Sequence, residues 1–280
     1  MTDKTMRGSA LRNKRSRRAR LGGAAPALLA ASLIAALVAG CSSSDDGGDT
    51  KAAPVTGPLP DAAQIIQESS RTTQTLQSVH LDLEVTDVPN LPVESVSADV
   101  TNQPQGAGQA MGEAKVRTAP EEPFIDTKFI VVDKTLYTAV NSSSYAPVGP
   151  AEQVYDPGVI LDKDKGLANV IAQVQNPKAE GRETVEGIAV VKVTGTIDGS
   201  VIDPVVPRLG EGAGTLPITL WIADVPPPSD GGSASTRPSD AASTGDGPNL
   251  VRAVVDKDGG TVEVTLSKWA EPVNVIKPAS

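Results

Sequence analysis

The stretch Val79-His80-Leu81-Asp82-Leu83-Glu84-Val85-Thr86 decides the fold class, because apolar and polar residues alternate at every position. Successive side chains of an extended strand point to opposite faces, so this period of two predicts a β-strand with one dry face and one face in water. Three segments that follow repeat the pattern. Their expected dry faces are Val96, Ala98 and Val100, then Ala114 and Val116, then Ile125, Thr127, Phe129 and Val131. Four such strands in succession predict an antiparallel meander.

Segments with helical periodicity precede and follow these four strands in the sequence. Residues 60–77 carry apolar positions at three- and four-residue spacings, and Asp61 stands where a helix needs an N-cap. Residues 157–174 repeat this spacing and predict two short helices, broken near residues 162–166. A short helical turn is expected at residues 200–209, where two prolines interrupt the pattern.

Further strands complete the expected sheet. They are predicted at residues 136–140, 183–185, 189–197, 216–223, 250–255 and 261–266. The turn signals Asp133-Lys134, Glu186-Gly187 and residues 256–260 join neighbouring strands. We therefore expect an α+β fold, in which a long, curved antiparallel sheet has its helices gathered on one side.

The N-terminus has the organisation of an export signal. The first twenty residues are rich in Arg and Lys and hold one acidic residue, Asp3, and residues 21–40 carry no charge. The ending Leu37-Val38-Ala39-Gly40-Cys41 resembles the lipobox of bacterial lipoproteins. This predicts a signal peptide at residues 1–40 and lipid on Cys41, which holds the chain on the outer face of the cytoplasmic membrane, with release within the cell envelope as an alternative. A membrane-spanning helix is the weaker interpretation, and the Arg17-Arg18 pair leaves the Sec and twin-arginine routes open.

Composition bounds the partners of the mature chain. Cys41 is the one cysteine, so it has no disulfide partner within the chain. Loss of residues 1–40 removes eight of the 25 basic and one of the 34 acidic residues, which leaves a net charge of −16. That charge disfavours nucleic acid as a partner. It also disfavours adhesion to anionic lipid, so membrane attachment must come from the anchor.

Low-complexity segments divide the mature chain. Residues 41–58 are rich in Ser, Asp, Gly and Pro and predict a lipidated flexible tether. Residues 225–249 have a similar composition but interrupt a strand pattern, so they predict a disordered hairpin loop rather than a domain boundary. The rest, residues 59–276, suits a single domain.

Catalytic and metal signatures are missing from the sequence. The one histidine, His80, lies on the wet side of an alternating strand, and no Gly-x-Ser-x-Gly motif presents a nucleophile. Residues 162–166 and 256–260 resemble the start of a calcium loop, but Gln173 and Ser267 stand at the twelfth position, where a bidentate Glu is required. We therefore expect no enzyme activity, no metal and no cofactor.

The expected core is rich in small aliphatic residues, with two Phe and two Trp in the whole chain. An apolar sheet face beneath apolar helices either closes into a solid core or encloses a cavity for an apolar ligand. The residue pattern alone favours the solid core, with the cavity as the alternative.

Several segments resemble the mycobacterial lipoprotein family that contains LprG, LprA and LppX, and LprG most closely. They are Gly57-Pro58-Leu59-Pro60-Asp61, Ser78-Val79-His80, Tyr155-Asp156-Pro157, Gly166-Leu167-Ala168-Asn169-Val170, Lys178-Ala179-Glu180-Gly181-Arg182 and Leu266-Ser267-Lys268-Trp269. The resemblance implies a half-open barrel whose helices, on the concave side, enclose a hydrophobic cavity. The implied cargo is a triacylated glycolipid, of the phosphatidylinositol mannoside or lipoarabinomannan type, or triacylglycerol. The implied partner is a major-facilitator membrane transporter.

On this basis the dry faces of the strands and one helix are the candidate lipid-binding residues. They are Val79, Leu81, Leu83, Val96, Ala98, Val100, Ala114, Val116, Phe129, Val131, Leu167, Val170 and Ile171. Exposing three sixteen-carbon chains to water would cost about 40 kcal/mol of free energy, so a carrier must enclose them. The alternative function is a tethered accessory or assembly partner of a transporter, without carrier activity. The chain departs from the family pattern at residues 225–249.

Overall fold

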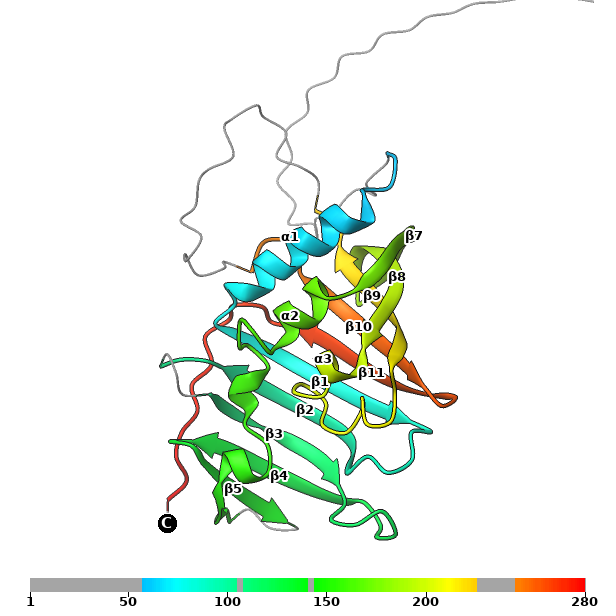
Figure 1. Ribbon diagram of the computed structural model, residues 1–280. Coiled ribbons are helices and arrows are strands. Elements are labelled where there is room, and N and C mark those ends of the chain that lie inside the picture. The colour runs from blue at the N-terminus through cyan, green and yellow to red at the C-terminus, as the bar shows by residue number, and fades with distance from the viewer. Residues whose placement is uncertain (1–56, 105–107, 141–143, 226–244, 280) are drawn as a thin grey trace, which may run out of the picture. The chain divides into compact units, whose positions relative to one another are not determined.

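The computed structural model describes residues 57–104, 108–140, 144–225 and 245–279, all within the compact unit Lys51–Ser280 (Figure 1). The signal peptide at residues 1–40, the lipidation site Cys41 and tether residues 42–56 therefore lie outside the described residues. Residues 226–244 of the expected loop lie outside them as well.

A curved, unclosed sheet of eleven antiparallel strands forms the body of the domain, in the order β6-β5-β4-β3-β2-β1-β11-β10-β9-β8-β7. The strands are β1 (Ser78–Thr86), β2 (Val93–Thr101), β3 (Gln109–Val116), β4 (Ile125–Val132), β5 (Thr135–Val140), β6 (Ala146–Pro150), β7 (Gln175–Val185), β8 (Ile188–Asp198), β9 (Thr215–Ala223), β10 (Leu250–Lys257) and β11 (Gly260–Ser267). The chain's first and last strands, β1 and β11, pair in the middle of the sheet. The two edges, β6 and β7, are consecutive in sequence, so the segment between them must cross the sheet from edge to edge.

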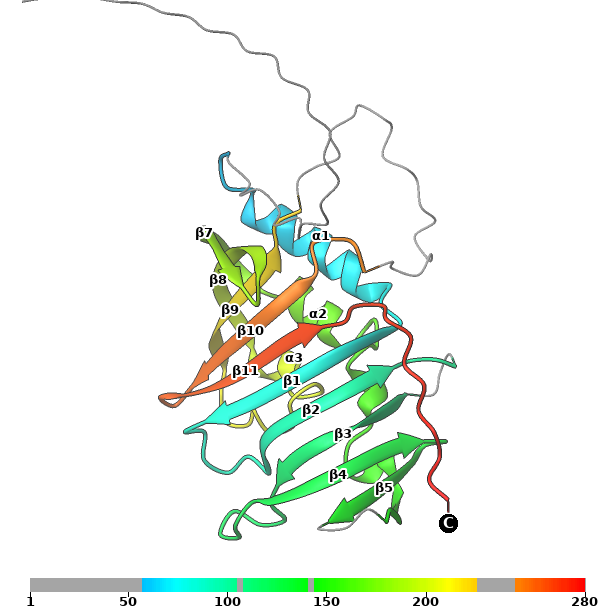
Figure 2. The same cartoon turned by 180° about the vertical axis from the view of Figure 1, so that it is seen from behind.

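The helices gather on one face of the sheet, as the α+β interpretation expects (Figure 1). They are α1 (Ala62–Gln74), η1 (Ala151–Gln153), η2 (Pro157–Val159), α2 (Leu167–Ala172) and α3 (Gly199–Ile202). Figure 2 shows the opposite face, along which the C-terminal segment runs past the strand ends. Helix α1 begins where the sequence predicts, because the Asp61 carboxylate accepts a hydrogen bond of 2.9 Å from the backbone N–H of Gln64.

The predicted hairpin turns are confirmed by their backbone angles and strand pairings. Asp133 and Lys134 have φ values of 52° and 59°, and Glu186 and Gly187 have 50° and 79°. Two successive positive φ values are typical of type I′ turns, whose twist matches that of antiparallel strands. Strands β9 and β10 pair with each other, so residues 225–249 do connect the two strands of a hairpin.

The edge strands differ from the expectation. β7 begins at Gln175 rather than at residue 183, and β6 was not predicted. Most residues of β7 are exposed or half-buried on both sides and its register shifts twice, so no alternation reveals it. β6 contains Pro147 and Pro150, which a strand tolerates at a sheet edge because one row of its N–H groups needs no partner.

The main core lies between the sheet and the helices, and smaller clusters lie on the other face. In one of these, Val275 of the C-terminal segment packs with Ile130 and Tyr137. In another, Trp221 and Trp269 flank buried Val190 and Val251. Trp221 therefore lies outside the main core, whereas Trp269 packs against both clusters from their margin.

Candidate functional site

The predicted dry faces of β1–β4 come together as three cross-strand rows, called here the apolar rows. The first is Val79, Val100, Ala110 and Val131; the second is Leu81, Ala98, Gly112 and Phe129; the third is Leu83, Val96, Ala114 and Thr127. Residues paired across antiparallel strands share a face, so the register places all ten predicted strand residues except Val116 in these rows. Val116 extends the same face beyond the third row, between Val93 and Ile125.

Burial decreases from the first apolar row toward the third. Every residue of the first row is at most 2% exposed. In the third row Leu83 is 7% exposed, and the other three residues are half-buried. Beyond it, Ile125 is 42% exposed. The apolar face is therefore sealed at one end of the strands and partly open at the other.

The thirteen candidate residues divide accordingly. Those buried in the structure are Val79, Leu81, Leu83, Ala98, Val100, Val131, Leu167, Val170 and Ile171. Those half-buried, called here the open strip, are Val96, Ala114, Val116 and Phe129. The α2 residues Leu167, Val170 and Ile171 belong to the same packed cluster as the buried strand residues, apart from Val131, which packs with Leu136 and Ala151. The structure thus brings the predicted strand and helix residues to one side of the sheet.

Charge is separated from the apolar rows by the strand alternation. Asp82, Asp99, Glu113 and Lys128 occupy strand positions that point to the opposite face. In β1–β4, none of the row positions carries an ionisable side chain. Because a charge loses its hydration when apolar groups cover it, this face suits contact with hydrocarbon.

The segment from η1 to α2, residues 151–172, lies over the sheet and is called here the cover (Figure 1). Specific contacts hold it in place. η2 lies against β2 and β3, where Gly158 touches Gly108 backbone to backbone. The Tyr155 hydroxyl donates a 2.9 Å hydrogen bond to the carbonyl of Val205. Burial, with a contribution from the Asp156 carboxylate, raises the pKa of Tyr155. This phenol therefore stays neutral and keeps its donor over the ordinary pH range.

Helix α1 is joined to the cover through its buried face. The Ser70 hydroxyl donates a 2.8 Å hydrogen bond to the carbonyl of Ala168 in α2. Ile65 and Ile66, one turn earlier, pack into the main core. The first helix and the cover therefore form one layer over the sheet.

A hollow of about 760 Å³ lies on the polar side of the same strands. Its lining comprises Asp82, Glu84, Ser95, Ser97, Glu113, Lys115, Asp126, Lys128 and Ala139, with Leu83, Val96, Ala114 and Thr127 between them. The first nine point away from the apolar rows, and neither the helices nor the second apolar row contributes to the lining. This hollow is therefore a surface groove lined mainly by polar residues, and it meets the apolar rows only at the third row.

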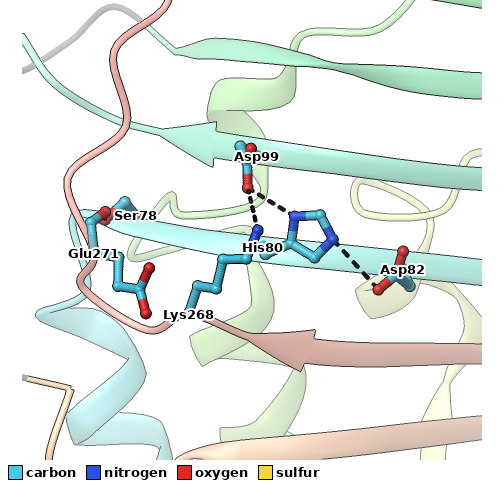
Figure 3. A network of polar contacts seen from close by, with 6 residues as sticks. All are labelled: Ser78, His80, Asp82, Asp99, Lys268 and Glu271. Carbon is cyan, nitrogen blue, oxygen red and sulfur yellow. Dashed lines mark hydrogen bonds and ion pairs between the residues drawn. The ribbon is translucent and has the colours of Figure 1, made fainter.

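A polar network joins β1, β2 and the C-terminal segment (Figure 3). His80 Nδ1 lies 2.7 Å from Asp99 Oδ1, and its Nε2 lies 3.4 Å from Asp82 Oδ2. Lys268 Nζ approaches the same Asp99 oxygen at 3.8 Å. The nearby Ser78 hydroxyl donates to the carbonyl of Glu271 at 2.5 Å, so it is engaged in holding the chain end. These contacts hold β1, β2 and the C-terminal segment together, which is a structural role.

In the part of the chain that the structure describes, no group of three or more His, Cys, Asp or Glu side chains could hold a metal ion. Within the same residues, no helix has both the length and the hydropathy needed to cross a membrane.

Sequence reasoning missed the residues that close the sealed end. Ala110 and Gly112 belong to the first and second apolar rows, and the period-two spacing to Ala114 was the signal that could have found them. The Gly108–Gly158 contact and the Tyr155 hydrogen bond join distant segments. No local pattern encodes such pairings.

The open antiparallel sheet, whose apolar rows lie beneath short helices (Figure 1), defines an α+β domain of the half-open-barrel class. Residues 61–275 match the family model described as LppX_LprAFG lipoprotein, and the chain belongs to this family. The LprF proteins of Mycobacterium bovis and Mycobacterium tuberculosis, each named putative diacylated glycolipid transporter, are 52% identical to it over 266 residues, 95% of this chain and of theirs. LprG of Mycobacterium bovis, named lipoarabinomannan carrier protein, is 34% identical over 253 residues, 90% of this chain and 93% of its own.

Solved structures agree with this assignment. The crystal structure of LprF from Mycobacterium bovis matches with a TM-score of 0.68 and 52% identity, covering 80% of this chain and 100% of that one. The structure of LppX from Mycobacterium tuberculosis matches with a TM-score of 0.51 and 26% identity, covering 77% and 98%. The family expectation is confirmed, and identity is higher to LprF than to LprG, the member that the sequence segments resembled most.

Proposed function

We propose that this protein is a membrane-anchored lipid carrier, which holds the acyl chains of a glycolipid against the apolar rows and moves them across the cell envelope. One observation carries the proposal: a charge-free sheet face passes without interruption from buried residues to the half-buried open strip. An apolar core that served stability alone would gain by being covered throughout. The names of the relatives, glycolipid transporter and lipoarabinomannan carrier, support the same function.

The energetics require enclosure. Two sixteen-carbon chains in water would cost about 25 kcal/mol, at about 0.8 kcal/mol per methylene. If the chains lie between the apolar rows and α2, each contact between protein side chains is replaced by a contact with hydrocarbon. Transfer from a bilayer is then nearly neutral in free energy, which a reversible carrier needs. We propose that chains enter at the open strip, where Val96, Ala114 and Val116 are already half-exposed.

The number of chains is the finer question. The resemblance to LprG suggests a triacylated glycolipid or triacylglycerol, whereas the LprF relatives are named for diacylated glycolipids. Because identity to LprF is higher, we propose a diacylated glycolipid as the first cargo to test. The triacylated lipids are the second.

Attachment and partner complete the proposal. Lipid on Cys41 would hold the domain at the outer face of the cytoplasmic membrane, and a major-facilitator transporter would supply or receive the lipid. A Cys41→Ser variant tests the attachment, because it should leave the membrane fraction for the soluble fraction. Its continued sedimentation with membranes would contradict lipid anchoring.

The test of cargo is native mass spectrometry on the unit from residue 51 onward, expressed in a mycobacterium without its lipidation site. We expect about one glycolipid per protein and, after organic extraction, fragments that give the head group and the chain count. A protein that carries no lipid, and takes none up from vesicles, would contradict carriage. That result would favour the alternative function as a tethered accessory of a transporter.

A further inference from the structure

The guanidinium of Arg182, on edge strand β7, binds the backbone of Gly57 and Pro58, just before helix α1. Its Nε lies 2.5 Å from Asp224 Oδ2, and its two terminal nitrogens donate to the carbonyls of Gly57 at 2.8 Å and Pro58 at 3.0 Å. The Asp224 side chain is 8% exposed, and its backbone N–H donates to Ala189 in β8. One side chain therefore ties residues 57 and 58 to the β7 edge of the sheet.

The chemistry of this contact requires arginine. A guanidinium presents donors in a fixed plane, so it can bind a carboxylate and two carbonyls at once, whereas a lysine ammonium lacks this fork. The Arg182 side chain is 24% exposed, which limits competition from water. The chain is therefore held at Gly57, before α1 begins at Ala62.

This contact fixes where the membrane tether leaves the domain. Cys41 lies sixteen residues before Gly57, and a flexible chain of that length, as the composition predicts, has an end-to-end distance of about 20 to 24 Å. The opposite edge, β6, is separated from β7 by the whole sheet, on the order of 50 Å at about 4.8 Å per strand. We infer that Arg182 and Asp224 form a clamp that presents the β7 edge to the lipid bilayer and leaves the β6 edge outermost.

Two exposed apolar side chains mark the presented surface. Leu59 is 40% exposed and follows Pro58, whose carbonyl the clamp residue Arg182 binds, and Val225 is 50% exposed and follows the clamp residue Asp224. The partner that fits is the bilayer surface itself, since the anchored chain limits what lies within reach. The inference rests on the proposed lipid at Cys41 and is independent of what the apolar rows bind.

Fluorescence energy transfer tests the orientation. Lipidated protein is reconstituted in phosphatidylcholine vesicles that carry a rhodamine lipid, with a donor dye on a single introduced cysteine. Val225→Cys reports the β7 edge, and Val148→Cys, at a residue 55% exposed in β6, is the matched control. Cys41 is the one native cysteine and is blocked by lipid, so each variant offers one thiol. We expect transfer from position 225 to exceed that from 148 by about twofold, because the two edges are far apart.

A second pair of variants tests the clamp. Arg182→Gln should reduce the difference between the two dye positions, and Arg182→Lys should retain part of it through Asp224. Thermal unfolding checks that both variants fold; if Arg182→Gln fails to fold, the two dye positions in the native background still decide the orientation. Equal transfer from both positions, or more from 148, would overturn the inference even if the protein carries glycolipid. Failure of the protein to remain on vesicles would overturn it together with lipid anchoring, while leaving acyl-chain binding intact.

Discussion

Gly108, just before strand β3, and Gly158 in η2 lie in direct backbone contact. A methyl group added at Gly108 would overlap the Cα and N of Gly158, whereas one added at Gly158 would lie 3.1 Å from the Cα of Gly108. Because η2 belongs to the cover, this contact decides how closely the cover lies on the sheet.

We expect Gly108→Ala to lower the free energy of unfolding by about 2 to 3 kcal/mol, since backbone must move to admit the methyl group. Gly158→Ala should cost less, because its neighbours need give only slightly. Urea unfolding measures both, with Gly214→Ala as the control, since no atom lies near a Cβ at that position. Equal stability of the Gly108 and Gly214 variants would refute the backbone contact.

Tyr155→Phe should remove the hydrogen bond to Val205 and lower stability by about 1 kcal/mol at neutral pH. The native protein should also lose stability in alkali that the variant keeps. The folded pKa of Tyr155 is raised above its ordinary value of 10.0, so its contribution is complete below pH 10 and is lost as the pH rises further. Unfolding measured from pH 8 to 11 checks this. A difference between the two proteins that does not change with pH would contradict the burial of the phenol.

Lys257→Met should loosen the segment after α3. The Lys257 ammonium donates to the carbonyls of Leu209 at 2.6 Å and Glu211 at 2.9 Å, and so joins β10 to that segment. We expect a loss of about 1 to 2 kcal/mol, because hydrogen bonds to a charged donor exceed neutral ones. Hydrogen exchange should rise at residues 203–214 and remain unchanged in β1–β4. A rise spread evenly over the domain would indicate that the contact has no local role.

The sequence predicts those parts of this molecule that depend on local alternation. The alternation from Val79 to Val85 predicts a strand with one apolar and one polar face. The same rule correctly places Val96, Ala98 and Val100 on the apolar face of the neighbouring strand. β7 escapes the rule because an edge strand exposed on both sides has no dry face to reveal it. The pairing of β1 with β11 and the hydrogen bond from Arg182 to the Gly57 carbonyl join residues far apart in sequence, which periodicity does not encode. Alternation also places the candidate residues on one face of the sheet. It does not predict that their burial decreases from the first apolar row to the third, because that depends on where the cover lies.

Filling the open strip should lower lipid loading without unfolding the domain. Val116 is half-buried on the apolar face of β3, so Val116→Trp adds bulk where we propose that acyl chains enter. Because the site is partly open, the indole can be accommodated at a cost within the usual 1 to 3 kcal/mol or so of overpacking. Met111→Trp is the matched control, since Met111 lies on the polar face of the same strand and is 39% exposed. Native mass spectrometry should show less bound lipid for Val116→Trp and normal loading for Met111→Trp, both with cooperative thermal unfolding. Equal loading of the two folded variants would place the acyl chains elsewhere.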